Sequence, residues 1–303
     1  MTKLYTTVVA LLLGISVYSQ SVSELDKRGR ESFESHDFEA AIRYFTDLIR
    51  FTSRPGKALS SSGSFAPEEG SQRDRVTVID PRTAVAYVER GRAYLATGDT
   101  TNAMKDFDQA LAIAPAMTAA HFCRATAWLI LNRIDLAIGD YDKALKLDPN
   151  FVRGYLGRGM ARLEKGEKQL ALEDFDAAVK LAPRDSNAYY YRGDAHRRNG
   201  DTARAIADFE YAIKLDPKLP NGYHGRGLIR FQNQDLDGAI KDFTTALTLD
   251  PRFAEAYAAR AYVHLIRGNP AQANSDIQRA LVLSPTLRPE IESNLKVIQN
   301  WKK

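Results

Sequence analysis

Residues 186–219 read SNAYYYRGDAHRRNGDTARAIADFEYAIKLDPKL, and the next 34 residues follow the same plan as PNGYHGRGLIRFQNQDLDGAIKDFTTALTLDPRF. Both stretches carry a tyrosine shortly before an Arg-Gly pair, an Asp-Phe pair further on, and a closing Asp-Pro. The closing proline recurs every 34 residues, at positions 81, 115, 149, 183, 217, 251 and 285. A fixed period of this length is typical of a repeat architecture in which each unit is one supersecondary element.

Each unit contains two predicted helices. In the first run, Tyr87, Gly91 and Tyr94 recur at the spacing of one helical face. After a Gly-Asp turn, Ala103 and Phe107 repeat this pattern in the second run, and a proline then ends it because proline cannot continue the backbone hydrogen-bond ladder. Neither helix can bury its apolar stripe alone, so we expect neighbouring units to stack around a continuous core.

The columns of residues shared by the units resemble the tetratricopeptide-repeat family, over residues 22–287. The first aromatic column is Tyr87, His121, Tyr155, Tyr189, Tyr223 and Tyr257, and the small column is Gly91, Ala125, Gly159, Gly193, Gly227 and Ala261. The resemblance implies an all-α fold, a right-handed α-solenoid of stacked helix-turn-helix hairpins. It also implies a concave groove, lined by the first helices, that binds extended peptides or helices. One departure is that arginine precedes the small column in every unit, where the family often has leucine.

The repeat pattern divides the chain into five parts. We expect a signal peptide at 1–19, a degenerate first unit at 20–52, an insertion at 53–80, six units over 84–287 and a capping helix at 288–303. The six units are 84–117, 118–151, 152–185, 186–219, 220–253 and 254–287. The first unit is expected to differ from the others because an end unit faces water on one side.

The amino terminus has the layout of a secretory signal. Lys3 precedes an apolar run of about 15 residues, and Val17 and Ser19 stand where a signal peptidase reads small side chains. The pattern predicts cleavage between Ser19 and Gln20 and export to the periplasm or cell envelope. The run is shorter than the roughly 20 residues of a membrane-spanning helix. An uncleaved anchor is the alternative, and only that alternative would bring membrane contact.

Residues 53–80 interrupt the array with serine, glycine and proline, including the run Ser60-Ser61-Ser62. This composition predicts a flexible linker. Because long loops inside compact domains are often functional, a binding tongue or lid is the alternative.

The composition disfavours several classes of function. Positive and negative charges are interspersed and nearly balanced, at a net +4, so no nucleic-acid partner is expected. One cysteine, Cys123, excludes an internal disulfide framework and a cysteine-based zinc site, and we expect it to be a small packed residue. The sequence contains no phosphate loop, nucleophile elbow or His-x-x-x-His pair. We therefore predict no enzyme activity, catalytic residue, metal site or small-molecule cofactor.

Two charged columns accompany the repeat. Arginine stands before the small column, and aspartate follows it sixteen residues later, as in Arg192 and Asp208. The two positions are equally far from the turn between the helices, so they lie level on antiparallel helices. We expect these residues to form stabilising ion pairs within or between hairpins. The alternative is a charged ladder that grips a ligand backbone.

The candidate binding residues come from a stripe on the first helices that changes from unit to unit while the scaffold columns stay constant. Aromatic and arginine side chains in this stripe are the types that dominate binding interfaces. The candidates are Phe122, Leu156, Met160, Tyr190, Tyr191, Asp194, Arg197, His224, Phe231 and Tyr262. The alternative is that part of the stripe, above all Leu129 and Leu163, packs between units.

These features predict a non-catalytic scaffold or adaptor of the cell envelope, whose groove binds a peptide segment or helix of a partner protein. Two alternatives remain open. One is a regulatory or accessory subunit of an envelope enzyme complex. The other is a signal-anchored membrane protein with an exported repeat domain.

Overall fold

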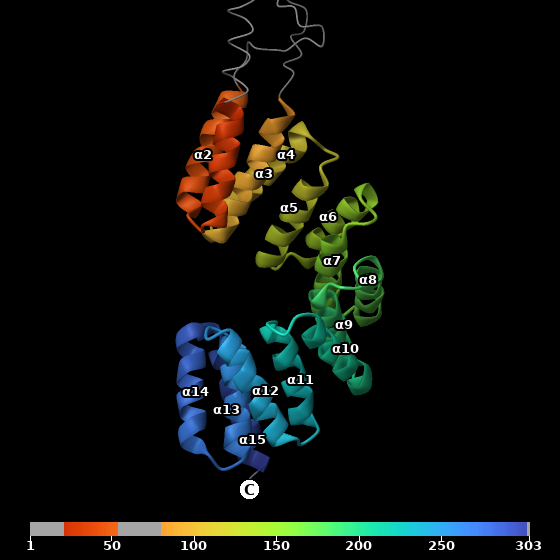
Figure 1. Cartoon of the computed structure of the whole chain (residues 1–303), viewed down its shortest axis with the longest axis vertical. Helices are drawn as coiled ribbons and strands as arrows, with labels where there is room; N and C mark the ends of the chain where they lie inside the picture. The colour runs from red at the N-terminus through yellow and green to blue at the C-terminus, as the bar shows by residue number, and fades with distance from the viewer. Residues whose placement is uncertain (1–20, 54–79, 302–303) are drawn as a thin grey trace, which may run out of the picture. The chain divides into compact units, whose positions relative to one another are not determined.

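The computed structural model describes residues 21–53 and 80–301 of the 303-residue chain, and this part is helical, with no strand (Figure 1). The predicted signal peptide and nearly all of the predicted insertion lie outside the described residues. The confirmed fold class is therefore all-α, built from stacked helical hairpins.

The described residues form seven hairpins and a final helix. The first pairs residues 21–34 with α2 (Phe38–Thr52). The next three are α3 (Pro81–Ala96) with α4 (Thr100–Ile113), α5 (Thr118–Ile130) with α6 (Ile134–Leu147), and α7 (Val152–Lys165) with α8 (Lys168–Leu181). The last three are α9 (Ser186–Arg198) with α10 (Thr202–Leu215), α11 (Pro220–Gln232) with α12 (Leu236–Leu249), and α13 (Ala254–Ile266) with α14 (Pro270–Leu283). A short 3₁₀ turn, η1 (Pro285–Leu287), then leads into α15 (Arg288–Trp301).

One boundary differs from the prediction. The first helix of the second hairpin begins at Pro81, three residues before the expected Ala84. Proline suits this place because the first residue of a helix has no intrahelical acceptor for its N–H, and the fixed φ of proline is already helical. Pro115, by contrast, lies beyond the end of α4, as its role as a helix terminator requires.

Each hairpin turn is held by a residue in the left-handed backbone region, at the same place in all seven hairpins. Glycine occupies it four times, for example Gly200 at φ 84°, and His36, Asn132 and Gln234 occupy the others. In four hairpins an aspartate then caps the second helix by accepting the N–H of the residue three positions on, as Asp201 does from Arg204 at 3.1 Å. These two features set the angle at which the chain reverses.

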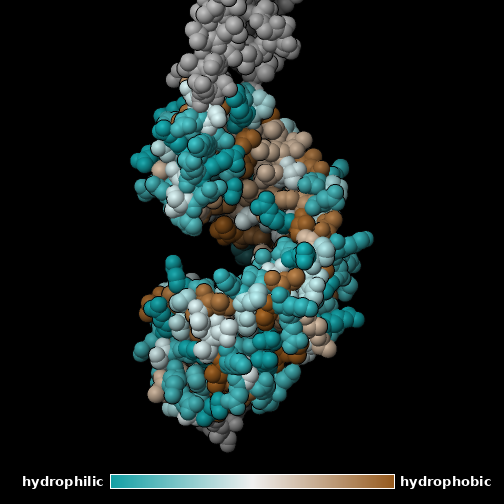
Figure 2. Space-filling view, in the orientation of Figure 1, coloured by the Kyte–Doolittle hydropathy of each residue, from teal (hydrophilic) through white to brown (hydrophobic). Residues whose placement is uncertain are grey.

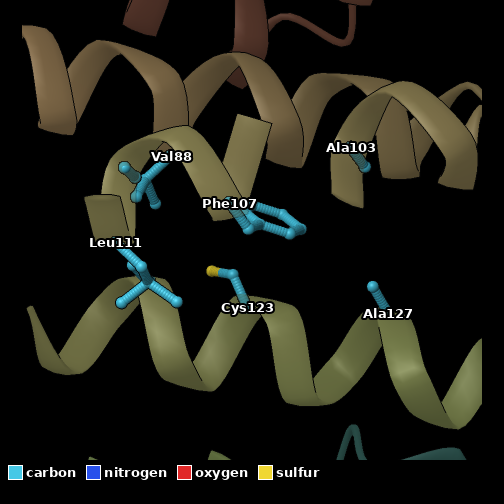
Figure 3. Packing of buried hydrophobic residues seen from close by; sticks show 8 residues of the cluster. Val88, Ala103, Phe107, Leu111, Cys123 and Ala127 are labelled. Atoms are coloured by element: carbon cyan, nitrogen blue, oxygen red, sulfur yellow. The ribbon is translucent and has the colours of Figure 1, made fainter. Parts of the chain in front are cut away.

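The core is built from the columns that recur in the sequence. Aromatic rings of the second helices are fully buried, namely Phe45, Phe107, Tyr141, Phe175, Phe209 and Phe243. The alanines on either side of them are also inaccessible, so the helices approach closely and the rings fill the space between them. Figure 3 shows this arrangement where α5 packs on the preceding hairpin, with Cys123 directed toward Val88 and Phe107. Burial raises the pKa of Cys123 to about 12, so this thiol is an inert packed residue.

The predicted arginine–aspartate pairs form in all six hairpins from α3 to α14. In each, the guanidinium donates through Nε and Nη2 to the aspartate sixteen residues on, as Arg192 does to Asp208 at 2.8 and 2.7 Å. Several of these arginines also reach the second helix of the preceding hairpin, as Arg192 does to Asp176 at 2.9 Å. The pairs therefore connect the two helices of one hairpin and join it to its neighbour, which makes them part of the scaffold.

The chain forms two compact units, Met1–Gly154 and Tyr155–Lys303. In the second unit, the first helices α9, α11 and α13 lie beside one another, and α15 packs against α13. Ile291 and Ile298 of α15 are buried there in a cluster with Ala258 and Tyr262. This unit carries most of the candidate binding residues.

Candidate partner-binding face

Four candidate residues of α9 lie together with two neighbours in what we call the α9 cluster: Tyr190, Tyr191, Asp194, Arg197, Arg198 and His224. The Tyr190 and Tyr191 rings are 5.1 Å apart and half-buried. Tyr191 stacks on Phe175 at 6.0 Å, and Tyr190 lies 6.0 Å from Phe209. Both rings thus rest on aromatic rings of the core, which positions them without the entropy cost of free side chains.

The charges of the α9 cluster are arranged around Asp194. Its carboxylate accepts two hydrogen bonds from Arg197, at 2.9 and 2.6 Å, and one from Arg198 at 2.8 Å. Arg198 also donates to Glu164 of α7 at 3.2 Å. These bonds hold both guanidinium groups in fixed positions, with Arg198 substantially exposed. The cluster therefore presents preorganised hydrogen-bond donors beside aromatic rings.

Two ionisable groups of the cluster remain neutral at neutral pH. Burial lowers the pKa of His224 to about 4, and the charge of Arg197 contributes to the shift, whereas that of Asp194 opposes it. The imidazole lies against the rings of Phe253 and Phe243, at 4.8 and 5.7 Å. Burial also raises the pKa of Tyr190 to about 12.

The shift at His224 predicts a pH-dependent stability. In the unfolded chain the imidazole takes up a proton below about pH 6.5, whereas the folded one does so only near pH 4. Stability is therefore lost as the pH falls through this window, by roughly 1–3 kcal/mol. We expect His224→Phe to lose less stability than wild type between pH 7 and pH 4 in urea unfolding. Parallel pH profiles for the two proteins would contradict the assignment.

The other candidates differ in how deeply they are buried. Leu156 is buried and is therefore a packing residue, whereas Met160 is half-buried. Phe231 packs in the same cluster as Tyr262, which is itself buried, and the Tyr262 hydroxyl accepts a hydrogen bond from Asn294 of α15 at 3.2 Å. The final helix thus covers the end of the stripe.

Phe122 lies in the first compact unit. Its half-buried ring contacts Phe151 edge-on at 5.1 Å and Tyr141 at 5.8 Å, and the guanidinium of Arg153 lies over it at 5.6 Å. Leu129 and Leu163 are the stripe residues that the alternative interpretation expects to pack between units. Both side chains are half-buried.

Two residues of this face are not among the ten candidates, although the sequence does suggest Arg198 as a surface charge that could steer an acidic segment toward the groove. Arg198 is four residues after Asp194 and so shares its helical face, a spacing that would have identified it. Asn294 lies on α15, 32 residues from Tyr262, and no periodicity in the sequence links the two positions.

The described residues contain no group of three or more His, Cys, Asp and Glu side chains arranged to hold a metal ion. Within the same residues, no helix combines the length and the apolar character needed to cross a bilayer.

The stacked hairpins, their left-handed turns and the recurring core columns define a helical repeat protein. The sequence matches the family description "Tetratricopeptide repeat" over residues 88–150 and 156–220, and "TPR repeat" over residues 227–266, together more than half of the chain. The chain belongs to the tetratricopeptide-repeat family, whose members generally mediate protein–protein interactions and typically act as non-catalytic scaffolds. No protein of curated function matches it significantly.

Solved structures share this fold. A tetratricopeptide repeat protein from Parabacteroides merdae is 18% identical, with a TM-score of 0.69, and the match covers 92% of this chain and 99% of that one. A chain of the APC/C hetero-tetramer Cut9-Hcn1 is 24% identical, with a TM-score of 0.63 over 71% of this chain, which spans only 42% of that one. The Pseudomonas aeruginosa pilF structure is 21% identical, with a TM-score of 0.56, and the match covers 67% of this chain and 92% of that one.

Proposed function

We propose that this protein is an exported, non-catalytic scaffold of the cell envelope that binds a peptide segment or helix of a partner protein on the first helices of its second compact unit. The observation that carries this proposal is the α9 cluster. Tyr190 and Tyr191 are fixed on the core, Arg197 and Arg198 are fixed on Asp194, and the ionisable side chains of His224 and Tyr190 stay neutral.

The binding mechanism follows from this rigidity. The aromatic rings and guanidinium groups already occupy defined positions, so little conformational entropy is lost when a partner binds. Aromatic and arginine side chains are also the types that contribute most to the binding energy of interfaces. Export is supported by the pattern at residues 1–19, in which Lys3 precedes an apolar run.

Site-specific photocrosslinking in intact envelopes tests the binding face. The chain offers a matched pair of tyrosines in one hairpin: Tyr190 on the first helix and the exposed Tyr211 on the second. We expect a photoreactive phenylalanine at Tyr190 to capture a defined protein and the same group at Tyr211 to capture none. Capture from Tyr211 alone would place the binding face on the second helices and refute the proposal.

Two accompanying measurements sharpen this test. Substitution of Arg197 and Arg198 by alanine should abolish capture from Tyr190, whereas Arg204→Ala, on the second helix of the same hairpin, should leave it unchanged. Mass spectrometry of the mature protein should find Gln20 at the amino terminus. A chain that retains residues 1–19 would instead support the membrane-anchored alternative.

A further inference from the structure

The turn between α5 and α6 exposes three large apolar side chains, at positions where each other 34-residue unit has at most one. Ile130, Leu131 and Leu136 are 58%, 45% and 52% exposed. Figure 2 shows hydrophobic surface at this end of α5. The position of Leu131 is occupied in the other 34-residue units by Thr97, Lys165, Asn199, Asn233 and Arg267. Large apolar side chains that adjoin one another on a surface are unusual in soluble proteins and mark interaction sites.

The same turn lacks the side-chain cap that an aspartate provides in four other hairpins. Glu167 and Asn269, at the N-caps of α8 and α14, also make no cap, but neither carries a positive charge. Arg133 stands at the N-cap of α6 and makes no side-chain cap. The equivalent residues elsewhere are Asp99, Glu167, Asp201, Asp235 and Asn269. An arginine here also places a positive charge at the positive end of a helix dipole. A residue that weakens its own helix without improving the packing, as Arg133 does, is typical of a functional position.

The charge of the turn indicates the chemistry of its partner. Arg133 is exposed, and its side chain forms no ion pair or hydrogen bond within the described part of the chain. Asp135, the acidic residue of this turn, is already engaged. An uncompensated guanidinium flanked by three aliphatic side chains is complementary to an apolar surface that carries a carboxylate.

We propose that Ile130, Leu131, Leu136 and Arg133, which we call the α5–α6 patch, form a second docking surface, distinct from the α9 cluster, for an acidic amphipathic segment of a partner protein. The aliphatic side chains of the segment cover the three apolar residues, and one of its carboxylates pairs with Arg133.

A protein segment fits this surface better than a lipid bilayer does. The turns of the first three hairpins lie at the same end of the first compact unit (Figure 1). Asp37 and Asp99 cap the helices at the other two turns. A flat anionic bilayer would meet all three turns and would be repelled by these carboxylates, whereas a peptide segment needs to contact only the α5–α6 patch.

Selection from a random-peptide library displayed on phage, with the purified protein as bait, tests this surface. We expect enrichment of segments that combine leucine or isoleucine with Asp or Glu and that bind, as synthetic peptides in fluorescence polarisation, at least about tenfold more weakly to Arg133→Asp and to Leu131→Lys. Leu131→Lys introduces the residue found at Lys165 of the next hairpin, and Arg133→Asp restores the aspartate cap of Asp99. Arg133→Asp should therefore melt at or above the wild-type temperature, which separates lost binding from lost folding.

The control is Thr97→Lys in the neighbouring turn of the same unit, which should bind these peptides as wild type does. Enrichment of basic or uncharged segments, or equal binding to wild type and both patch variants, would overturn the proposal. So would a wild-type dimer in sedimentation that Leu131→Lys dissociates, because the patch would then serve a second copy. Co-sedimentation with phosphatidylglycerol vesicles that depends on Leu131 would likewise replace the protein segment with a bilayer.

Discussion

Replacement of Asp242 by alanine is expected to lower the free energy of unfolding by about 3–5 kcal/mol. Asp242 is 2% exposed, accepts hydrogen bonds from Arg226 at 3.0 and 2.8 Å, and forms an ion pair with the Nη1 of Arg230 at 2.9 Å. Its removal leaves two half-buried guanidinium groups facing a gap in place of a carboxylate. The loss is large because desolvation of these cations is then no longer offset by their partner.

Neighbouring repeats can unfold separately, so the measurement should be local. Amide hydrogen exchange across α11 and α12 should accelerate more than exchange in α3 and α4. The matched control is Asp237→Ala, five residues earlier on α12, where an 83% exposed carboxylate pairs with Arg267 at 2.5 Å. An exposed pair of this kind contributes at most about 1 kcal/mol. Equal losses for the two variants would show that the buried columns are not part of the scaffold.

Phe209→Ala is expected to lower the free energy of unfolding by about 3–5 kcal/mol, through the lost apolar burial and the cavity left behind. The ring is inaccessible and packs in a cluster with Ala205 and Ile229. It also fills the space above Gly225, where even one added carbon would lie 2.6 Å from the ring. Because Gly225 belongs to the following hairpin, loss of the ring weakens both the α9–α10 hairpin and its junction with α11.

Thermal and urea unfolding measure this effect, with Tyr211→Ala as the control two residues further along α10. Tyr211 is exposed and contacts Tyr189 at a ring distance of 4.5 Å, so its truncation should remove less than about 1 kcal/mol. A loss at Phe209 no greater than that at Tyr211 would be incompatible with the role of the ring as the core of the repeat. Phe209→Ala should also disturb Tyr190, which rests 6.0 Å from it.

Much of the scaffold could be predicted from the sequence because it depends on local spacing. A 34-residue period with apolar positions at helical intervals defines two helices per unit. The pairing of Arg192 with Asp208 also follows from spacing, since both residues are equally far from a tight turn. The second contact of Arg192, to Asp176 of the preceding hairpin, depends on how hairpins stack, and only the structure establishes it.

The candidate site was predictable only in part. Helical spacing suggested the stripe on the first helices, and Tyr190, Asp194 and Arg197 of that stripe lie together on α9. Spacing cannot say how deeply a position of the stripe is buried, because that depends on which helix packs beside it. Leu156 is buried as a result, and Tyr262 is covered by Asn294 and the rest of α15.

The sequence by itself determined the repeat, its helices, the core columns and the level pairing of opposite charges, because each depends on residues within one 34-residue unit or on its exact recurrence. Only the tertiary structure decided which variable side chains are exposed, which arginines are already paired, and where an apolar turn such as Ile130–Leu136 meets solvent. Those properties depend on contacts between units. The spacing of residues within one hairpin does not determine how that hairpin packs on the next.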